Sequence, residues 1–203
     1  MSVKMIGHSH LRHLEKNISS KDRRKLAKLS NYTSFAVSGL KTCHLLGRQK
    51  AKFEMFASSF KSDDHVVLFI GDNDIDKSDS AEVTAWRILS FASSLRRKYS
   101  VASVTVHQLL PRYEGARGNI FEYNTKADKV NGIFKANCKE VGLYFLDSGF
   151  KFPGGDKNGS SKSYENKRAN FRADGVHLSK MGYKKIIKTI GHVFRQCNKA
   201  RQM

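Results

Sequence analysis

The chain has 203 residues, of which 39% are hydrophobic and only two are proline, so its composition excludes a disordered or Pro-rich linker protein. Thirty-seven Lys and Arg against 18 Asp and Glu give a net charge of +19, well above the magnitude of about 2–8 that is ordinary for a small domain. No apolar run approaches the roughly 20 residues of a membrane helix, and residues 1–10 lack the apolar region of a secretory signal. We therefore expect one domain spanning residues 1–203, located inside the cell, in the cytoplasm or the nucleus.

Five short apolar runs predict buried strands, because they are rich in β-branched and aromatic residues and most are bounded by Gly, Asp or Pro. Between them lie four longer segments with helical spacing of apolar residues, and Ser179 is a plausible N-cap of the last one. Strands that alternate with helices predict an α/β protein with a parallel sheet covered on both faces. The predicted strands are Val3–Gly7, Tyr32–Gly39, His65–Asp74, Ser103–Pro111 and Leu143–Asp147, and the predicted helices are Arg48–Phe60, Ala81–Tyr99, Phe121–Val141 and Ser179–Cys197.

Polar residues and glycines follow the first two predicted strands, at the sheet edge where ligands of such folds bind. Ser9 opens a helix directly after the first strand, so its hydroxyl lies at this edge and its amide can receive a developing negative charge. An N-cap serine is the simpler interpretation of Ser9 alone. Gly39 leaves a backbone amide free to point at a ligand, although a simple turn is also common at such a position.

The third strand ends abruptly in the sequence Gly71–Asp72–Asn73–Asp74. The Asn73 side-chain amide at a strand end can complete an oxyanion pocket, and the alternative is an Asx-turn. Asp174 and His177 lie three residues apart, ahead of the last predicted helix. At this spacing the carboxylate can accept a hydrogen bond from the imidazole, which leaves the second ring nitrogen to take a proton from a serine. Asx capping beside a surface histidine is the alternative interpretation.

Four further residues are candidates for contacts with a substrate: His8, Asp72, His107 and Arg112. For His8 and His10, which flank Ser9, exposure on a turn is favoured over a catalytic role. His107 ends the fourth strand without a carboxylate beside it, and it is interpreted as a pocket-wall or buried histidine. Arg112 could bind an anionic substrate group or form a structural ion pair.

Taken together and in this order, these segments resemble the four sequence blocks of the SGNH/GDSL hydrolases. The blocks are matched by Gly7–His8–Ser9, by Gly39, by Gly71–Asp72–Asn73–Asp74 and by Asp174–Gly175–Val176–His177, which span nearly the whole chain. One departure concerns the residue before the serine. The family usually has Asp there and this chain has His8, which bears on the geometry of the loop rather than on the identity of the base.

The resemblance implies a three-layer, flavodoxin-like fold with a five-stranded parallel sheet, and hydrolysis of short-chain acyl esters such as acetyl esters without a metal or other cofactor. It implies that Ser9 is the nucleophile, His177 the general base and Asp174 the residue that orients the imidazole. The backbone amides of Ser9 and Gly39 and the side chain of Asn73 would form the oxyanion hole.

The charge predicts contact with polyanions such as nucleic acid, through Lys and Arg groups that include Lys21–Lys28, Arg48–Lys52, Arg96–Lys98 and a basic tail over residues 198–203. Residues 149–170 are predicted to form a flexible basic loop. One alternative function is therefore a catalytically weak or inactive SGNH-fold adaptor that binds nucleic acid. Another is an esterase of lipid or carbohydrate esters that the charge docks to an anionic surface. The Gly-His-Ser block and the ending "DGVHLS" also resemble the esterase domain in the first open reading frame of some non-LTR retrotransposons. The sequence leaves the oligomeric state open.

Overall fold

The computed structural model describes residues 2–17, 31–75, 79–153 and 168–202. Its centre is one sheet with the strand order β2-β1-β3-β4-β5, and every neighbouring pair is parallel. This is the flavodoxin-like order of doubly wound folds. The predicted α/β fold with a five-stranded parallel sheet is confirmed. The strands are β1 (Ser2–Gly7), β2 (Asn31–Ala36), β3 (His65–Phe69), β4 (Ser103–His107) and β5 (Tyr144–Leu146).

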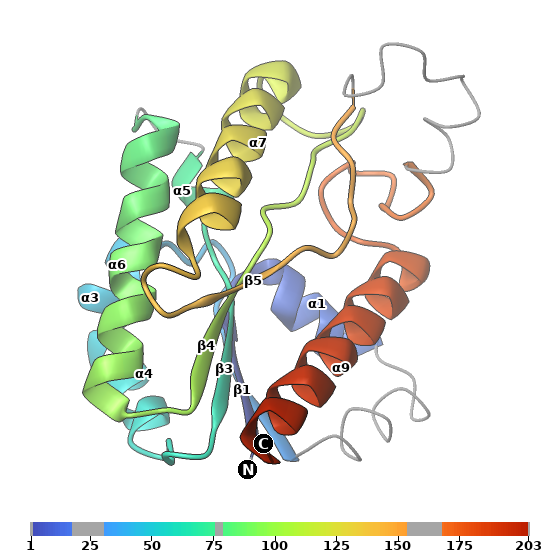
Figure 1. The fold of residues 1–203 in the computed structure, drawn as a ribbon. Helices are drawn as coiled ribbons and strands as arrows, with labels where there is room; N and C mark the ends of the chain where they lie inside the picture. Colours follow the sequence, from blue (N-terminus) through green and yellow to red (C-terminus); the bar gives the residue numbers. More distant parts are fainter. Residues whose placement is uncertain (1, 18–30, 76–78, 154–167, 203) are drawn as a thin grey trace.

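Helices cover both faces of the sheet (Figure 1). Two of them, α1 (Ser9–Asn17) and α9 (Lys180–Gln202), lie on one face. Of the helices in the described ranges, α3, α4, α6 and α7 lie on the other face, and the single-turn helix α5 stands at the carboxyl end of β3. The bounds of these elements are Thr42–Leu46 for α3, Lys50–Ala57 for α4, Asp72–Ile75 for α5, Ala81–Tyr99 for α6 and Ile120–Asn137 for α7.

Two hydrophobic cores result because successive side chains of a strand point to opposite faces of the sheet. In β3, Val67 and Phe69 pack with α1 and α9, whereas Val66 and Leu68 pack with α4, α6 and α7. All five side chains of β3 are buried. This explains why the central strands are continuous apolar runs in the sequence rather than alternating ones.

Several elements differ in length from their predictions. β2 and β3 end at Ala36 and Phe69, the residues that pair with Gly7 at the end of β1, so the ladder stops on all three strands at one level. The residues that follow are therefore loops at a common edge of the sheet. Helix α3 was not predicted, and α9 ends at Gln202 rather than at Cys197. The predicted basic group at residues 21–28 and most of the predicted loop at residues 149–170 lie outside the described residues. None of the helices in the described part of the chain has the length and apolar character needed to cross a membrane.

Candidate active site

The carboxyl ends of β1, β2 and β3 bring three of the predicted sequence blocks to one place. The His8 amide donates to the Phe69 carbonyl at 3.2 Å, and the Val37 amide donates to the Gly7 carbonyl at 3.0 Å. A side chain at Gly7 would bring its Cβ within 2.7 Å of the Phe69 Cβ, so glycine permits this close approach of the strands. The three loops are thus tied together at Gly7 and His8, the two residues that precede Ser9.

Asp174, His177 and Ser9 form a continuous chain of hydrogen bonds. The two ring nitrogens of His177 serve different partners: Nε2 lies 3.1 Å from the Ser9 Oγ, and Nδ1 lies 2.8 Å from the Asp174 Oδ2. Ser9 and His177 are separated by 168 residues in sequence and are both half-buried. Partial burial acts to raise the pKa of Asp174, but its hydrogen bonds with His177 outweigh this effect and bring the pKa down to about 2. The carboxylate is therefore ionised and able to orient the imidazole.

The turn that carries Asp174 and His177 is fixed by backbone contacts. Asp174 Oδ1 accepts hydrogen bonds from the amides of Val176 and His177 at 2.9 and 2.8 Å. Gly175 has a φ of +65°, and its carbonyl accepts from the Tyr113 amide at 2.9 Å. A Cβ at Gly175 would lie 2.2 Å from the Tyr113 carbonyl oxygen, so this turn requires glycine.

Arg168 also holds this turn, a role that no sequence pattern indicated. Its guanidinium donates to the carbonyls of Arg172 at 2.6 Å and Ala173 at 3.0 Å, and to that of Glu114 at 3.2 Å. Because every residue has a backbone carbonyl, such a contact leaves no pattern in the sequence by which it could be found.

The three predicted oxyanion donors lie on the loops at this edge. Among the backbone hydrogen bonds between described residues, none uses the amide of Ser9 or Gly39 as the donor. Gly39 is exposed, with a φ of +68°. The Asn73 side chain donates one N–H to the Leu40 carbonyl at 3.2 Å, which places it beside the Gly39 loop and leaves its second N–H available. This arrangement can supply donors to a developing oxyanion.

The family model described as "GDSL-like Lipase/Acylhydrolase" matches residues 8–190 of the chain. The chain belongs to the GDSL-like lipase/acylhydrolase family. It is accordingly an ester hydrolase, and the predicted family is confirmed. No curated protein sequence matches the chain significantly.

Solved structures share the fold of this acylhydrolase at low sequence identity. A Bacteroides fragilis protein assigned as an acylhydrolase has a TM-score of 0.69 at 18% identity, over 96% of this chain and 86% of its own. A member of the lipolytic G-D-S-L family from Veillonella parvula has a TM-score of 0.68 at 16% identity, over 96% and 98% of the two chains. The lipase/acylhydrolase of Enterococcus faecalis has a TM-score of 0.62 at 13% identity, over 96% and 95%.

In this acylhydrolase the residue before Ser9 pairs with the first residue of α5, the single-turn helix that follows β3. His8 Nε2 lies 2.6 Å from Asp72 Oδ2, and the other carboxylate oxygen accepts from the Tyr123 hydroxyl and the Leu110 amide at 2.7 and 3.1 Å. Burial acts to raise the pKa of Asp72, but the interactions with His8 lower it overall. The carboxylate is therefore ionised within the protein.

The expectation that His8 and His10 are exposed turn residues is wrong. His8 is 2% exposed and His10 is 4% exposed, because β1 delivers both beneath the loops that follow β3 and β4. Burial, and then the proximity of His8, lower the pKa of His10 well below its ordinary value. Neither histidine lines the cleft beside His177.

Asp74 and His107 are also buried and partnered within the acylhydrolase. Both oxygens of Asp74 accept from the Thr42 amide, at 3.1 and 3.3 Å, and burial raises the pKa of Asp74. His107 is 2% exposed, as predicted for a buried histidine, and contacts the Gln108 carbonyl and the Ser148 hydroxyl. Burial lowers the pKa of His107 to about 4, so its ring is neutral near pH 7.

A cleft of about 890 Å³ lies beside His177. Arg112 lines it, with its guanidinium carbon 3.8 Å from the centre of the Tyr123 ring. This stacking fixes the direction of the Arg112 side chain. The cleft is lined mainly by polar and charged residues, which include Arg112, Arg117, Asn119, Glu122, Lys126 and Asp174.

Proposed function

We propose that this family member is a serine esterase for short-chain acyl esters, acetyl esters in particular. Ser9 is the nucleophile, His177 the general base and Asp174 the residue that orients the imidazole. The observation that carries the proposal is the continuous hydrogen-bond chain from Asp174 Oδ2 through both nitrogens of His177 to Ser9 Oγ. A serine, a base and an orienting carboxylate in hydrogen-bond contact are the parts that nucleophilic acyl transfer requires.

In the first step, the Ser9 Oγ attacks the carbonyl carbon of the ester while His177 Nε2 takes the hydroxyl proton. The carbonyl oxygen becomes an oxyanion, which accepts hydrogen bonds from the amides of Ser9 and Gly39 and from the Asn73 side chain. Asp174 stabilises the imidazolium through its bond to Nδ1. As the tetrahedral intermediate collapses, His177 gives the proton to the leaving alkoxide, and the alcohol departs.

In the second step, a water molecule attacks the acyl–Ser9 carbonyl and His177 Nε2 takes its proton. As the second tetrahedral intermediate collapses, His177 Nε2 gives this proton to Ser9 Oγ, and the acyl group leaves as a carboxylic acid. The two steps together consume one water molecule and restore Ser9 and His177 to their starting protonation states.

The preference for a small acyl group is supported by the surroundings of Ser9. The loops after β1 and β3 lead directly into α1 and α5, so they add little material for a deep apolar tunnel. The cleft beside His177 is lined mostly by polar side chains, which favour a polar alcohol portion of the substrate over a long acyl chain. Faster turnover of long-chain esters than of acetyl esters would contradict this preference.

The test is hydrolysis of a chromogenic acetyl ester by the purified chain and by the variants Ser9→Ala and His177→Ala. We expect each variant to lose nearly all turnover, because the two residues act as a unit. Ser58→Ala is a matched control, because in the described part of the chain the Ser58 hydroxyl donates to the Met55 carbonyl on α4, away from Ser9 and His177. Turnover by the folded wild-type chain no greater than that of the two variants would overturn the proposal.

A second activity, contact with polyanions, is supported by the net charge of +19. If the alternative of a catalytically weak adaptor holds, binding to a 20-bp DNA duplex will occur without turnover. We expect affinity in fluorescence anisotropy to fall steeply between 50 and 200 mM salt, because phosphate contacts release counterions. Ser9→Ala should bind the DNA as tightly as the wild type does. DNA binding that is insensitive to salt would contradict the account based on phosphate contacts. An intracellular location and the resemblance to retrotransposon esterase domains stay predictions.

A further inference from the structure

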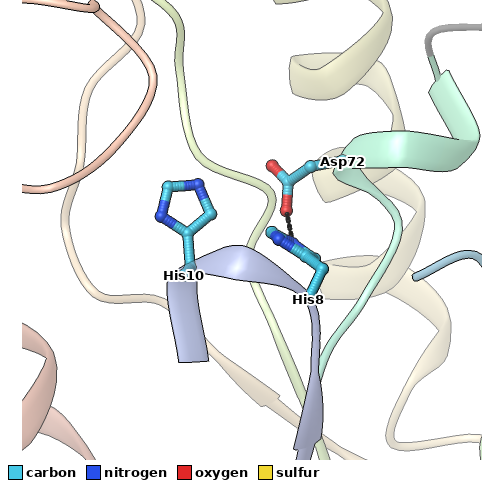
Figure 2. A group of neighbouring side chains, drawn as sticks. All are labelled: His8, His10 and Asp72. Carbon is cyan, nitrogen blue, oxygen red and sulfur yellow. Dashed lines mark hydrogen bonds and ion pairs between the residues drawn. The ribbon is translucent and has the colours of Figure 1, made fainter. Parts of the chain in front are cut away.

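We infer that His8, His10 and Asp72 form a binding site for one divalent transition-metal ion, beside the turn that carries Ser9. Each residue offers one ligand atom, and these three atoms all lie within 4.8 Å of one another. Figure 2 shows His10 standing beside the His8–Asp72 pair, with His8 in the turn before α1, His10 in the first turn of α1 and Asp72 at the start of α5. The site is separate from the Asp174–His177 pair.

His10 supplies an independent observation in favour of a ligand. It is 4% exposed, and its Nδ1 has no hydrogen-bond partner among the residues that the structure describes. Its ring is instead surrounded by other imidazoles, with centroids at 5.0 Å for His8 and 5.5 Å for His177. Buried polar atoms are nearly always satisfied in folded proteins, so an unsatisfied imidazole within reach of a carboxylate and a second imidazole points to a missing partner.

Asp72 is already oriented as a ligand. Its Oδ1 accepts from the Tyr123 hydroxyl at 2.7 Å and from the Leu110 amide at 3.1 Å, which leaves Oδ2 facing His8. Such outer contacts to a ligating carboxylate are a regular feature of protein metal sites, because they fix the direction of its remaining lone pairs.

The donor set decides the class of ion. Two imidazole nitrogens and one carboxylate oxygen suit Zn²⁺ and its neighbours Co²⁺, Ni²⁺ and Cu²⁺, whereas Ca²⁺ and Mg²⁺ take oxygen ligands. Metal–nitrogen bonds of about 2.0–2.1 Å require the ligand atoms to approach more closely than 4.8 Å, through small rotations of the His10 and His8 side chains. The ion would take the place of the direct contact between His8 Nε2 and Asp72 Oδ2.

The consequence for the enzyme is inhibition. His8 and His10 immediately flank Ser9, so drawing their rings together changes the position of the Ser9 hydroxyl relative to His177. A shift of about 1 Å in a reacting group is enough to lower turnover by about 100-fold. The ion takes no part in the proposed hydrolysis, which proceeds through Ser9 and His177 alone.

The test is calorimetric titration of Zn²⁺ into chelator-treated, dialysed protein. We expect one ion per chain for the wild type, and an affinity at least about tenfold weaker for His10→Asn. This variant removes no hydrogen bond that the structure shows, so it should remain folded, which a thermal melt checks. His13→Asn is the matched control, because His13 also lies on α1 and contacts the His177 ring at 4.5 Å but is not part of the cluster.

An unchanged affinity of His10→Asn for Zn²⁺ would overturn the inference. An equal loss of Zn²⁺ affinity in His13→Asn would also overturn it, because it would indicate a different histidine site at the surface. If His10→Asn fails to fold, His8→Asn provides the same comparison. Added Zn²⁺ should slow ester hydrolysis by the wild type and leave the rate of His10→Asn unaffected. Because the titration measures binding directly, failure of the esterase proposal would not remove this test.

Discussion

His8 Nε2 lies 2.6 Å from Asp72 Oδ2, in a buried contact that joins the loop carrying Ser9 to the loop carrying Asn73. Across the same contact, Asp72 is anchored to the Leu110 amide after β4 and to the Tyr123 hydroxyl on α7. The loop of Ser9, the loop of Asn73 and the cleft wall at Tyr123 are therefore linked through a single carboxylate. Where the family usually has Asp before the serine, this chain has the complementary partner of Asp72.

This pairing predicts that restoring the family residue damages the enzyme. His8→Asp would place two carboxylates against each other in a buried site, and we expect it to cost about 3–5 kcal/mol of stability. His8→Asn can still donate to Asp72 and should cost only about 1–3 kcal/mol. Both variants should lower kcat, His8→Asp by the larger factor. Urea unfolding and acetyl-ester kinetics in the presence of EDTA measure these effects, and a His8→Asp variant as stable as the wild type would contradict the account.

Asn73→Ala is expected to lower kcat by about 100- to 1000-fold, because it removes a donor to the oxyanion. Its effect on stability should be small, about 1 kcal/mol, for the lost bond to the Leu40 carbonyl. Asn137→Ala is the matched control, since its amide also donates to a backbone carbonyl, that of Ile133, on α7. Steady-state kinetics of both variants measure whether kcat falls in Asn73→Ala alone. Equal activities of the two would show that Asn73 is not an oxyanion donor.

Asp174 predicts a dependence of stability on pH. Its pKa of about 2 in the folded chain lies below the ordinary value of 3.8, so ionised Asp174 stabilises the fold above pH 4. This contribution is lost as the pH falls from about 4 towards 2. We expect Asp174→Asn to have a lower Tm than the wild type at pH 6, and the difference to shrink as the pH approaches 2.5. A difference in Tm that stays constant over this range would argue against the interaction.

Gly71 predicts a large loss of stability on substitution. Its φ is +115°, and a Cβ there would lie 2.7 Å from the Leu109 side chain and 2.8 Å from that of Ile88. We expect Gly71→Ala to lower the free energy of unfolding by about 2–5 kcal/mol through backbone strain and overpacking. Gly132→Ala on α7 meets nothing within 4 Å, and it should raise stability by about 0.5–1 kcal/mol. Denaturant unfolding of both variants tests the contrast in sign.

The sequence by itself determined the order of the elements and the segments that carry chemistry. Strands that are buried on both faces appear as continuous apolar runs, and these runs were enough to predict the parallel sheet. The helical spacing of apolar residues was enough to predict α6 with its bounds. The polar residues after these strands are informative because parallel strands all end at one edge. That topological rule, together with the family resemblance, was sufficient to group Ser9, Asn73 and His177 before any distance was known.

Only the tertiary structure decided what depends on contacts between distant residues. Whether His8 and His10 face water or the interior is set by the loops that pack over β1, and their local sequence looks the same in both cases. The cluster with Asp72 exists because β1 and β3 are neighbours, and Arg168 holds its turn through backbone carbonyls that carry no sequence signal. Burial and hydrogen-bond partners are properties of the whole packed chain, and therefore the candidate metal site could be found only in the folded protein.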